Sequence, residues 1–183
     1  MASTEVPLSI ASAPSSNSLS VVVIGKQQYY APSVQDNSYW FSVYDRNSLA
    51  QVYSQVQANN ADTVPADLSG KFDTAQYFLV VTTRSLQSAY VPAGALYSFL
   101  VNSGASVALK KLTQVYQQVG CGSLGIVAYA MAGTLGPGSP THPRVEASGI
   151  SVNNTLYLEA TLVGTPVNNA TLYSPFPLTP PTP

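Results

Sequence analysis

The segment from Gly120 to Gly125 is the best match in this chain to a motif that carries chemistry. It reads Gly120-Cys121-Gly122-Ser123-Leu124-Gly125 and fits the pattern G-x-G-x-x-G. A dinucleotide site needs this turn directly after a strand and at the start of a helix, where free backbone N–H groups meet phosphate. Here the preceding residues look helical and the following ones look like a strand. We therefore expect a helix-to-strand connection, with a nucleotide-dependent enzyme using this loop as the alternative.

The other residues that could support catalysis are isolated. His142 is the single histidine, in a loop between two prolines, and a Ser-His-Asp triad would have to run through it without a nucleophile elbow. Cys121 is the single cysteine, so an internal disulfide and a four-cysteine zinc site are excluded. We expect Cys121 to be a small buried residue rather than a nucleophile. Asp62 and Asp67 flank a loop and give a weak signal for calcium. We predict no enzymatic activity, no catalytic residues, no cofactor and no metal.

The composition narrows the class of partner. Charged residues make up 8% of the 183 positions, against about 25% in a typical domain, and the net charge is −1 with seven basic residues. This argues against a nucleic-acid partner and against a polybasic membrane patch. No apolar run reaches the ~18 residues of a membrane span, and the first residues do not resemble a signal peptide. A neutral surface rich in hydroxyl and amide groups is typical of extracellular or virion-associated proteins.

Aromatic residues in or near the predicted loops are the strongest binding candidates. Tyrosine and tryptophan offer a flat apolar face and a hydrogen-bonding edge, which suits sugar rings and protein partners alike. The alternative is that rings of the segment 39–44 divide between core and surface. The predicted ligand contacts are Tyr29, Tyr30, Trp40, Arg84 and Tyr90.

The stretch from Tyr77 to Gly104 would organise the fold that positions these side chains. Its first six residues are β-branched, aromatic or large and aliphatic, which predicts a strand buried on both faces. Pro92 then suits a first helical position, with Leu96, Phe99 and Leu100 on one stripe and Gly104 as the stop. Strand, loop and helix together indicate half of an α/β unit.

The flanking segments predict its partners. Strands are expected at 19–24, 39–44 and 126–131, and helices at 49–56, capped by Ser48, and at 106–119. Residues 26–37 and 61–71 are expected to be loops, and a hairpin is expected within 149–163 around Asn153-Asn154. The prediction is one α/β domain at 19–163, a mixed β-sheet sandwich with helices on its faces. Residues 1–18 are expected to be an arm and 164–183 a Pro-rich extended tail.

Several of these segments resemble a known family. They are Phe78 to Ser85, Pro92 to Leu100, Gly104-Ala105-Ser106, and the stretch from Tyr129 to Gly138 with Glu146 after it. Together, over about residues 39–147, they resemble the interleukin-like EMT inducer (PANDER-type) domain. The resemblance implies a compact α/β sandwich without known catalytic residues, used in signalling proteins and as a sugar-binding or accessory module. The cysteines of the secreted animal members are absent, which favours a bacterial or phage version.

These observations favour a non-enzymatic recognition or structural module that binds a carbohydrate or protein surface. Tails of this composition are disordered unless neighbours hold them. We therefore expect a homo-oligomer, or partner chains in a larger assembly such as a virion or tail-fibre component. A secreted signalling-type protein is the other alternative.

Overall fold

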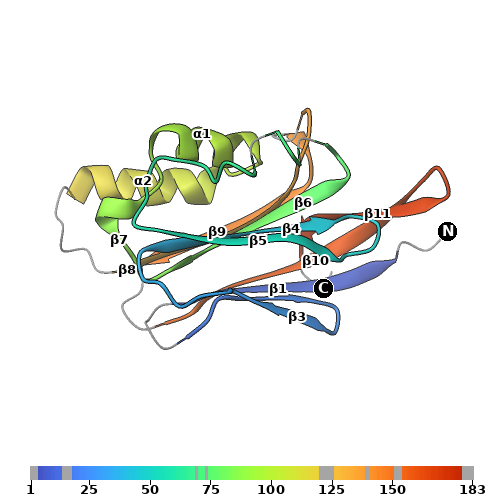
Figure 1. Ribbon diagram of the computed structural model, residues 1–183, viewed down its shortest axis with the longest axis horizontal. Helices are drawn as coiled ribbons and strands as arrows, with labels where there is room; N and C mark the ends of the chain where they lie inside the picture. The colour runs from blue at the N-terminus through green and yellow to red at the C-terminus, as the bar shows by residue number, and fades with distance from the viewer. Residues whose placement is uncertain are drawn as a thin grey trace, which may run out of the picture.

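The structure is a computed structural model that describes residues 4–13, 18–68, 70–72, 74–119, 126–138, 141–150 and 154–178. Within these ranges the chain forms strands, two α-helices and one 3-10 turn (Figure 1). Their bounds are β1 Glu5–Ser12, β2 Val21–Ile24, β3 Gln27–Tyr30, β4 Ser38–Asp45, β5 Gln51–Ala58, β6 Tyr77–Arg84, β7 Leu86–Gln87, the 3-10 turn Ser88–Tyr90, α1 Gly94–Asn102, α2 Val107–Val119, β8 Ile126–Thr134, β9 Arg144–Ile150, β10 Leu156–Val167 and β11 Ala170–Pro177.

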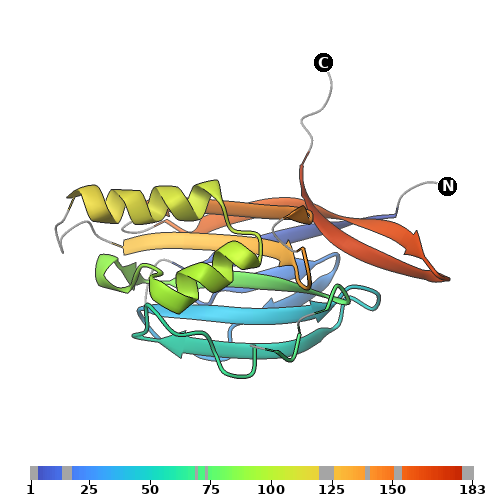
Figure 2. The ribbon, with the colours of Figure 1, turned by 90° about the horizontal axis from the view of Figure 1, so that it is seen from above.

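The strands form two stacked sheets. Sheet A has the order β11-β10-β1-β2-β3, and sheet B has the order β5-β4-β6-β8-β7 with β9 along the other side of β8. All pairings among the described strands are antiparallel, so the predicted mixed sheet is wrong. The described elements are mostly strands, so the fold is β-rich. Figures 1 and 2 show α1 and α2 over one face of sheet B, with sheet A under the other. The predicted sandwich with helices on its faces therefore becomes, among the described residues, a sandwich with one helical layer on sheet B.

Sheet B is buried on both sides, which explains its composition. Odd-numbered residues of β4 and β6 pack toward the helices, and even-numbered ones pack toward sheet A. The helix-side core includes Tyr39, Phe41, Val43, Leu79, Val81, Leu96, Leu100, Leu109 and Tyr129. The sheet-side core includes Leu8, Ile10, Val22, Trp40, Tyr44, Phe78, Val80, Ala130, Leu158 and Leu162. The expectation that Tyr77–Thr82 is a strand buried on both faces is confirmed.

The N-terminal segment is the largest correction to the sequence-based prediction. Residues expected to be an arm form β1, which lies in the middle of sheet A between β10 and β2. The signal is the alternation of Val6, Leu8 and Ile10, whose side chains face the core. Pro7 fits this strand because its carbonyl oxygen accepts a hydrogen bond from Gly25 N, at 2.8 Å, so its nitrogen faces the turn beyond the end of β2.

The predicted helix at 49–56 is also wrong, because Gln51–Ala58 is strand β5 at the edge of sheet B. Its apolar residues have helical spacing for a different reason. Tyr53 packs against the helix-side core, whereas Val56 packs against the sheet-side core. In a strand, residues i and i+3 point to opposite faces, so a strand covered on both faces can imitate a helical pattern.

The structure also differs from the predictions for the C-terminal part of the chain, a hairpin within 149–163 and an extended tail at 164–183. The hairpin expected within 149–163 is not formed by the described strands, because β9 pairs with β8 in sheet B and β10 pairs with β1 in sheet A. Residues 151–153 of that segment lie outside the described residues. The predicted tail instead contains the end of β10 and all of β11. Asn168 and Asn169 both have positive φ, 46° and 67°, which suits the two-residue turn between these strands. The predicted loop at 26–37 contains β3.

The other elements agree more closely with the sequence. The predicted strands at 39–44 and 126–131 correspond to β4 and β8, and the predicted helix at 106–119 corresponds to α2. Helix α1 begins at Gly94, two residues after the predicted start at Pro92. Gly104 follows its C-cap with φ +109°, as expected of a glycine stop.

Arg46 joins the two sheets where β4 ends. Its side chain is 9% exposed and donates hydrogen bonds to Tyr173 O at 2.8 Å, to Ser174 Oγ at 2.6 Å and to Ala75 O. Tyr173 and Ser174 belong to β11, whereas Ala75 precedes β6. The hydrogen bonds from Arg46 therefore fix the end of sheet A against sheet B.

The close approach of α1 to β8 gives a testable prediction. A Cβ on Gly133 would lie 2.3 Å from the Ser103 carbonyl oxygen at the end of α1, although Gly133 itself has no unusual φ. Gly133→Ala should therefore lower the free energy of unfolding by about 1–3 kcal/mol, as overpacking does, in urea denaturation. Gly149→Ala is the matched control, since its Cβ would meet Leu156 at an ordinary 3.7 Å. Equal stability of the two variants would contradict this packing.

Candidate functional site

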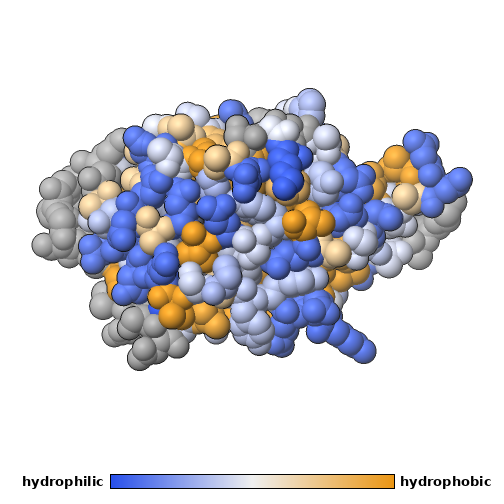
Figure 3. All heavy atoms as spheres, in the orientation of Figure 1, coloured by the Kyte–Doolittle hydropathy of each residue, from blue (hydrophilic) through white to orange (hydrophobic). Residues whose placement is uncertain are grey.

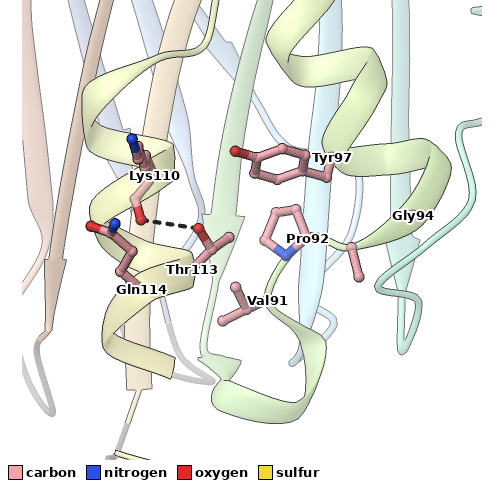
Figure 4. A pocket seen from close by; sticks show the side chains of 8 residues that line it. Val91, Pro92, Gly94, Tyr97, Lys110, Thr113 and Gln114 are labelled. Carbon is pink, nitrogen blue, oxygen red and sulfur yellow. Dashed lines mark hydrogen bonds between the residues drawn. The ribbon is translucent and has the colours of Figure 1, made fainter. Parts of the chain in front are cut away.

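The described residues form a groove between α1 and α2. It has a volume of about 490 Å³, within the range of small-molecule sites. One wall comes from the segment before α1 and from α1 itself, and the other comes from α2 (Figure 4). Its lining residues are Val91, Pro92, Ala93, Gly94, Tyr97, Lys110, Thr113 and Gln114.

The two walls of the groove differ in chemistry. The α1 wall offers the Tyr97 ring and the Pro92 ring, with Val91 below them, while α2 contributes the ammonium group of Lys110 and the amide of Gln114 (Figure 4). Thr113 Oγ1 is 3.0 Å from the Lys110 carbonyl oxygen, to which it donates. An apolar ring surface thus faces hydrogen-bonding groups across a gap of ligand size.

Backbone hydrogen bonds from a loop hold the α1 wall. Ala93 N donates to Ala61 O at 2.7 Å, and Leu96 N donates to Asp62 O at 3.1 Å. The 3-10 turn before α1 is held by the hydroxyl of Tyr39, a buried residue of β4 that donates to Tyr90 O. The position of the α1 wall is therefore set by sheet B and by the loop that follows β5.

Glu146 of β9 fixes the α2 wall. Its carboxylate accepts hydrogen bonds from Ser106 N, Ala108 N and Leu109 N at 3.0, 3.0 and 3.3 Å, and from Ser106 Oγ at 2.7 Å. These are the free N–H groups of the first turn of α2, so a strand residue supplies the cap that a helix needs. The negative charge also complements the helix dipole.

Burial and hydrogen bonding oppose each other at this cap. Partial burial raises the pKa of Glu146, but the hydrogen bonds from Ser106, Ala108 and Leu109 outweigh it and hold the pKa below its usual value. The hydroxyl of Tyr129, a fully buried residue of β8, donates to the same carboxylate at 3.1 Å. The pKa of Tyr129 is raised well above its usual value by burial and then by the nearby charge of Glu146.

Two of the five predicted ligand contacts are inside the protein. Trp40 is 2% exposed, packs between the sheets and donates its indole N–H to Ser54 Oγ at 2.9 Å. Arg84 is 3% exposed, donates to Ser18 O at 2.7 Å and lies 3.6 Å from the Asp36 carboxylate. Their prediction as surface contacts is wrong, because both faces of sheet B are covered.

The three predicted tyrosines lie on opposite sides of sheet B. Tyr29 is half-buried between the two sheets, where its ring meets Tyr44 edge-on at 5.0 Å and its hydroxyl donates to Leu49 O. Tyr30, beside it on β3, is 53% exposed. Tyr90 packs against the helix-side core, on the other side of sheet B. The structure therefore does not bring the predicted residues together in one site.

Among the described residues, the side chains that could support catalysis or metal binding are not brought together. The loop Gly120–Gly125, with Cys121, lies outside the described residues, but α2 precedes it and β8 follows it, opposite to the order of a dinucleotide motif. His142 is half-buried. Within the described ranges, no group of three or more His, Cys, Asp or Glu side chains is placed to hold a metal ion. Neither α1 nor α2, as far as they are described, has the length and hydropathy needed to cross a lipid bilayer.

The sequence pattern does not single out the groove residues. Tyr97 looks like a core residue because it follows Leu96 in an apolar helix, and Lys110 and Gln114 look like an ordinary solvated face of the next helix. A usable signal is the spacing of Lys110, Thr113 and Gln114 at i, i+3 and i+4, which places one polar stripe beside the preceding helix.

The comparisons with known proteins give no family. No protein-family model matches the chain, and a search of curated proteins finds no relative.

The cap of α2 gives a pH-dependent prediction. The folded-state pKa of Glu146 is lowered, so its stabilising effect should be complete above the unfolded-state pKa of about 4.3 and should be lost as the pH falls through the folded-state pKa. Glu146→Gln should lower the free energy of unfolding by about 1 kcal/mol at pH 7, and by less at pH 3, in urea denaturation. Glu159→Gln on the exposed face of β10 is the control. A deficit for Glu146→Gln that does not shrink in acid would contradict the charged cap.

Proposed function

We propose that this chain is a non-enzymatic recognition module that binds the exposed end of a glycan in the groove between α1 and α2. The observation that carries the proposal is that the Tyr97 and Pro92 rings face Lys110 and Gln114 across a groove with a volume of about 490 Å³. The C–H faces of a sugar pack on an aromatic ring, while its hydroxyl oxygens accept from ammonium and amide groups.

The low charge of the chain supports a neutral ligand. Charged residues are 8% of the sequence, so binding cannot depend on a strong field, and Lys110 acts as a local hydrogen-bond donor. An aromatic contact contributes about 0.5–1.5 kcal/mol beyond its buried area. A single groove of this kind binds weakly, so oligomers or an array of copies would supply avidity.

The proposal includes the wider setting expected from the sequence. The resemblance of residues 39–147 to the interleukin-like EMT inducer domain is part of this proposal and rests on the sequence segments named above. An extracellular or virion-associated module, repeated in an oligomer or joined to partner chains, fits an uncharged surface. On the face seen in Figure 3, apolar atoms occur as small separate groups among hydrophilic ones.

An architectural subunit is the second candidate, and one observation favours it. Strands β3 and β11 are the two edges of sheet A, and β5 is an edge of sheet B. Unpaired strand edges are ready sites for pairing with another chain. In that case the edges would contact neighbouring copies, and the groove would bind no sugar.

Glycan-array binding of the purified protein, followed by NMR titration with galactose, mannose, fucose and N-acetylglucosamine, tests the proposal. Chemical-shift changes should concentrate at 91–97 and 110–114. Tyr97→Ala should lower the affinity three- to tenfold by loss of ring contact, and Lys110→Ala about fivefold by loss of one hydrogen bond. Lys111→Ala is the matched control, because the neighbouring lysine does not line the groove.

Two results would count against the glycan proposal. One is the absence of any array signal together with unchanged spectra at millimolar sugar. The other is binding that Tyr97→Ala and Lys111→Ala affect equally. If sedimentation also shows oligomers that substitutions on β5 or β3 dissociate, the architectural function replaces it.

A further inference from the structure

The outer face of sheet A carries a row of side chains that the groove does not explain. Cross-strand pairing places Tyr157 opposite Ala11, Ala11 opposite Val21, and Val21 opposite Tyr30. Directly paired residues point to the same face of a sheet, and the core-facing residues of these strands are their neighbours Leu158, Ile10, Val22 and Tyr29. The row therefore crosses four strands on the surface that faces away from sheet B.

The two ends of this row are exposed tyrosines. Tyr157 is 64% exposed and Tyr30 is 53% exposed, whereas Ala11 and Val21 between them are small and half-buried. Three strand spacings separate the tyrosines, or roughly 14 Å. The Tyr30 hydroxyl donates to Gln28 Oε1 of the same strand at 2.6 Å, which holds the ring along β3. The result is a shallow platform with an aromatic ring at each end.

A second row beside it is polar except for Val23. Glu159 pairs with Ser9, Ser9 pairs with Val23, and Val23 pairs with Gln28, all on the same face. Ser9 Oγ donates to Glu159 Oε1 at 2.6 Å. A carboxylate has about four lone-pair sites, so Glu159 can also accept hydroxyl hydrogens from a ligand. The polar row runs parallel to the aromatic one and is in reach of the same bound molecule.

The charges on this face select among partners. The five strands of sheet A contain two acidic residues, Glu5 and Glu159, and no lysine or arginine. A polyanion has no cation to pair with on these strands. A second copy laid face to face would place one acidic face against another without a compensating charge, which is unfavourable. A neutral, extended and hydroxyl-rich chain meets neither obstacle.

We propose that the outer face of sheet A is a second binding site, for a linear β-1,4-linked glycan chain lying across β10, β1, β2 and β3. Sugar rings near the two ends of the bound segment stack on Tyr157 and Tyr30, and the sugars between them lie over Ala11 and Val21. Hydroxyl groups along one edge hydrogen-bond with Glu159, Ser9 and Gln28. The site is separate from the α1–α2 groove, because sheet B lies between the two.

Isothermal titration calorimetry with β-1,4-linked hexasaccharides of glucose, xylose, mannose and N-acetylglucosamine tests this site. At least one should bind, and its trisaccharide should bind more weakly because it cannot reach both tyrosines. Tyr30→Ala and Tyr157→Ala should each lower the affinity about three- to tenfold. The double variant should bind undetectably once Tyr97→Ala has also disabled the groove. Both residues are exposed, so circular dichroism and melting temperature should stay unchanged.

Two control variants separate this site from the others. Val52→Ala removes an exposed side chain from β5 of sheet B, and Tyr97→Ala disables the groove; both should keep hexasaccharide affinity. Failure of all four hexasaccharides to bind would overturn the proposal, as would binding that the folded double variant retains when Tyr97→Ala has disabled the groove. Loss of binding in Tyr97→Ala alone would assign the chain to the groove and would also overturn it. A fall in affinity for Glu159→Ala, without a change in melting temperature, would support the polar row.

Discussion

The fold depends on the burial of sheet B from both sides. Every residue of β4 from Ser38 to Tyr44 is buried, as are those of β6 from Phe78 to Arg84. Strands of this kind cannot leave either face in water, since apolar area buried is worth about 25 cal/mol per Å². The helices cover one face and sheet A covers the other. The N-terminal strand, the C-terminal hairpin and both helices are therefore required by the composition of β4 and β6.

The surface sites follow from this layering. Tyr39 and Tyr129 of sheet B each use a buried hydroxyl to hold the helical layer, Tyr39 at the 3-10 turn before α1 and Tyr129 at the Glu146 cap of α2. Buried tyrosines need such partners. The groove is the space that remains between two helices fixed in this way, so its shape is set by the core and not by the ligand. Because one face of sheet A covers sheet B, its other face is turned to solvent and carries Tyr30 and Tyr157.

Sequence patterns located the elements that have one dominant signal. The buried strand from Tyr77, the helix after Gly104 and the strand from Ile126 could be predicted because their apolar runs or stripes are unambiguous. Strand β5 was mistaken for a helix because it has apolar residues on both faces, and β1 was hidden by the Ser, Ala and Pro of residues 1–18 around its alternating Val6, Leu8 and Ile10. For the predicted ligand contacts, the sequence shows the type of each residue but not whether its side chain is exposed. Trp40 and Tyr30 look alike in a list of aromatic residues, yet one is in the core and the other is in solvent.

Native-state amide hydrogen exchange tests the layered account most directly, because it reads each strand separately. Residues Leu8 to Ala11 lie between two paired strands in the middle of sheet A. We expect their amides to exchange with protection close to that of Leu79 and Val81 in β6, since both sheets unfold together around one shared core. Exchange of the β1 amides at the rate of an unstructured segment, with β6 still protected, would contradict the account. The N-terminal residues would then be the arm that their composition suggests, and sheet B would need another cover.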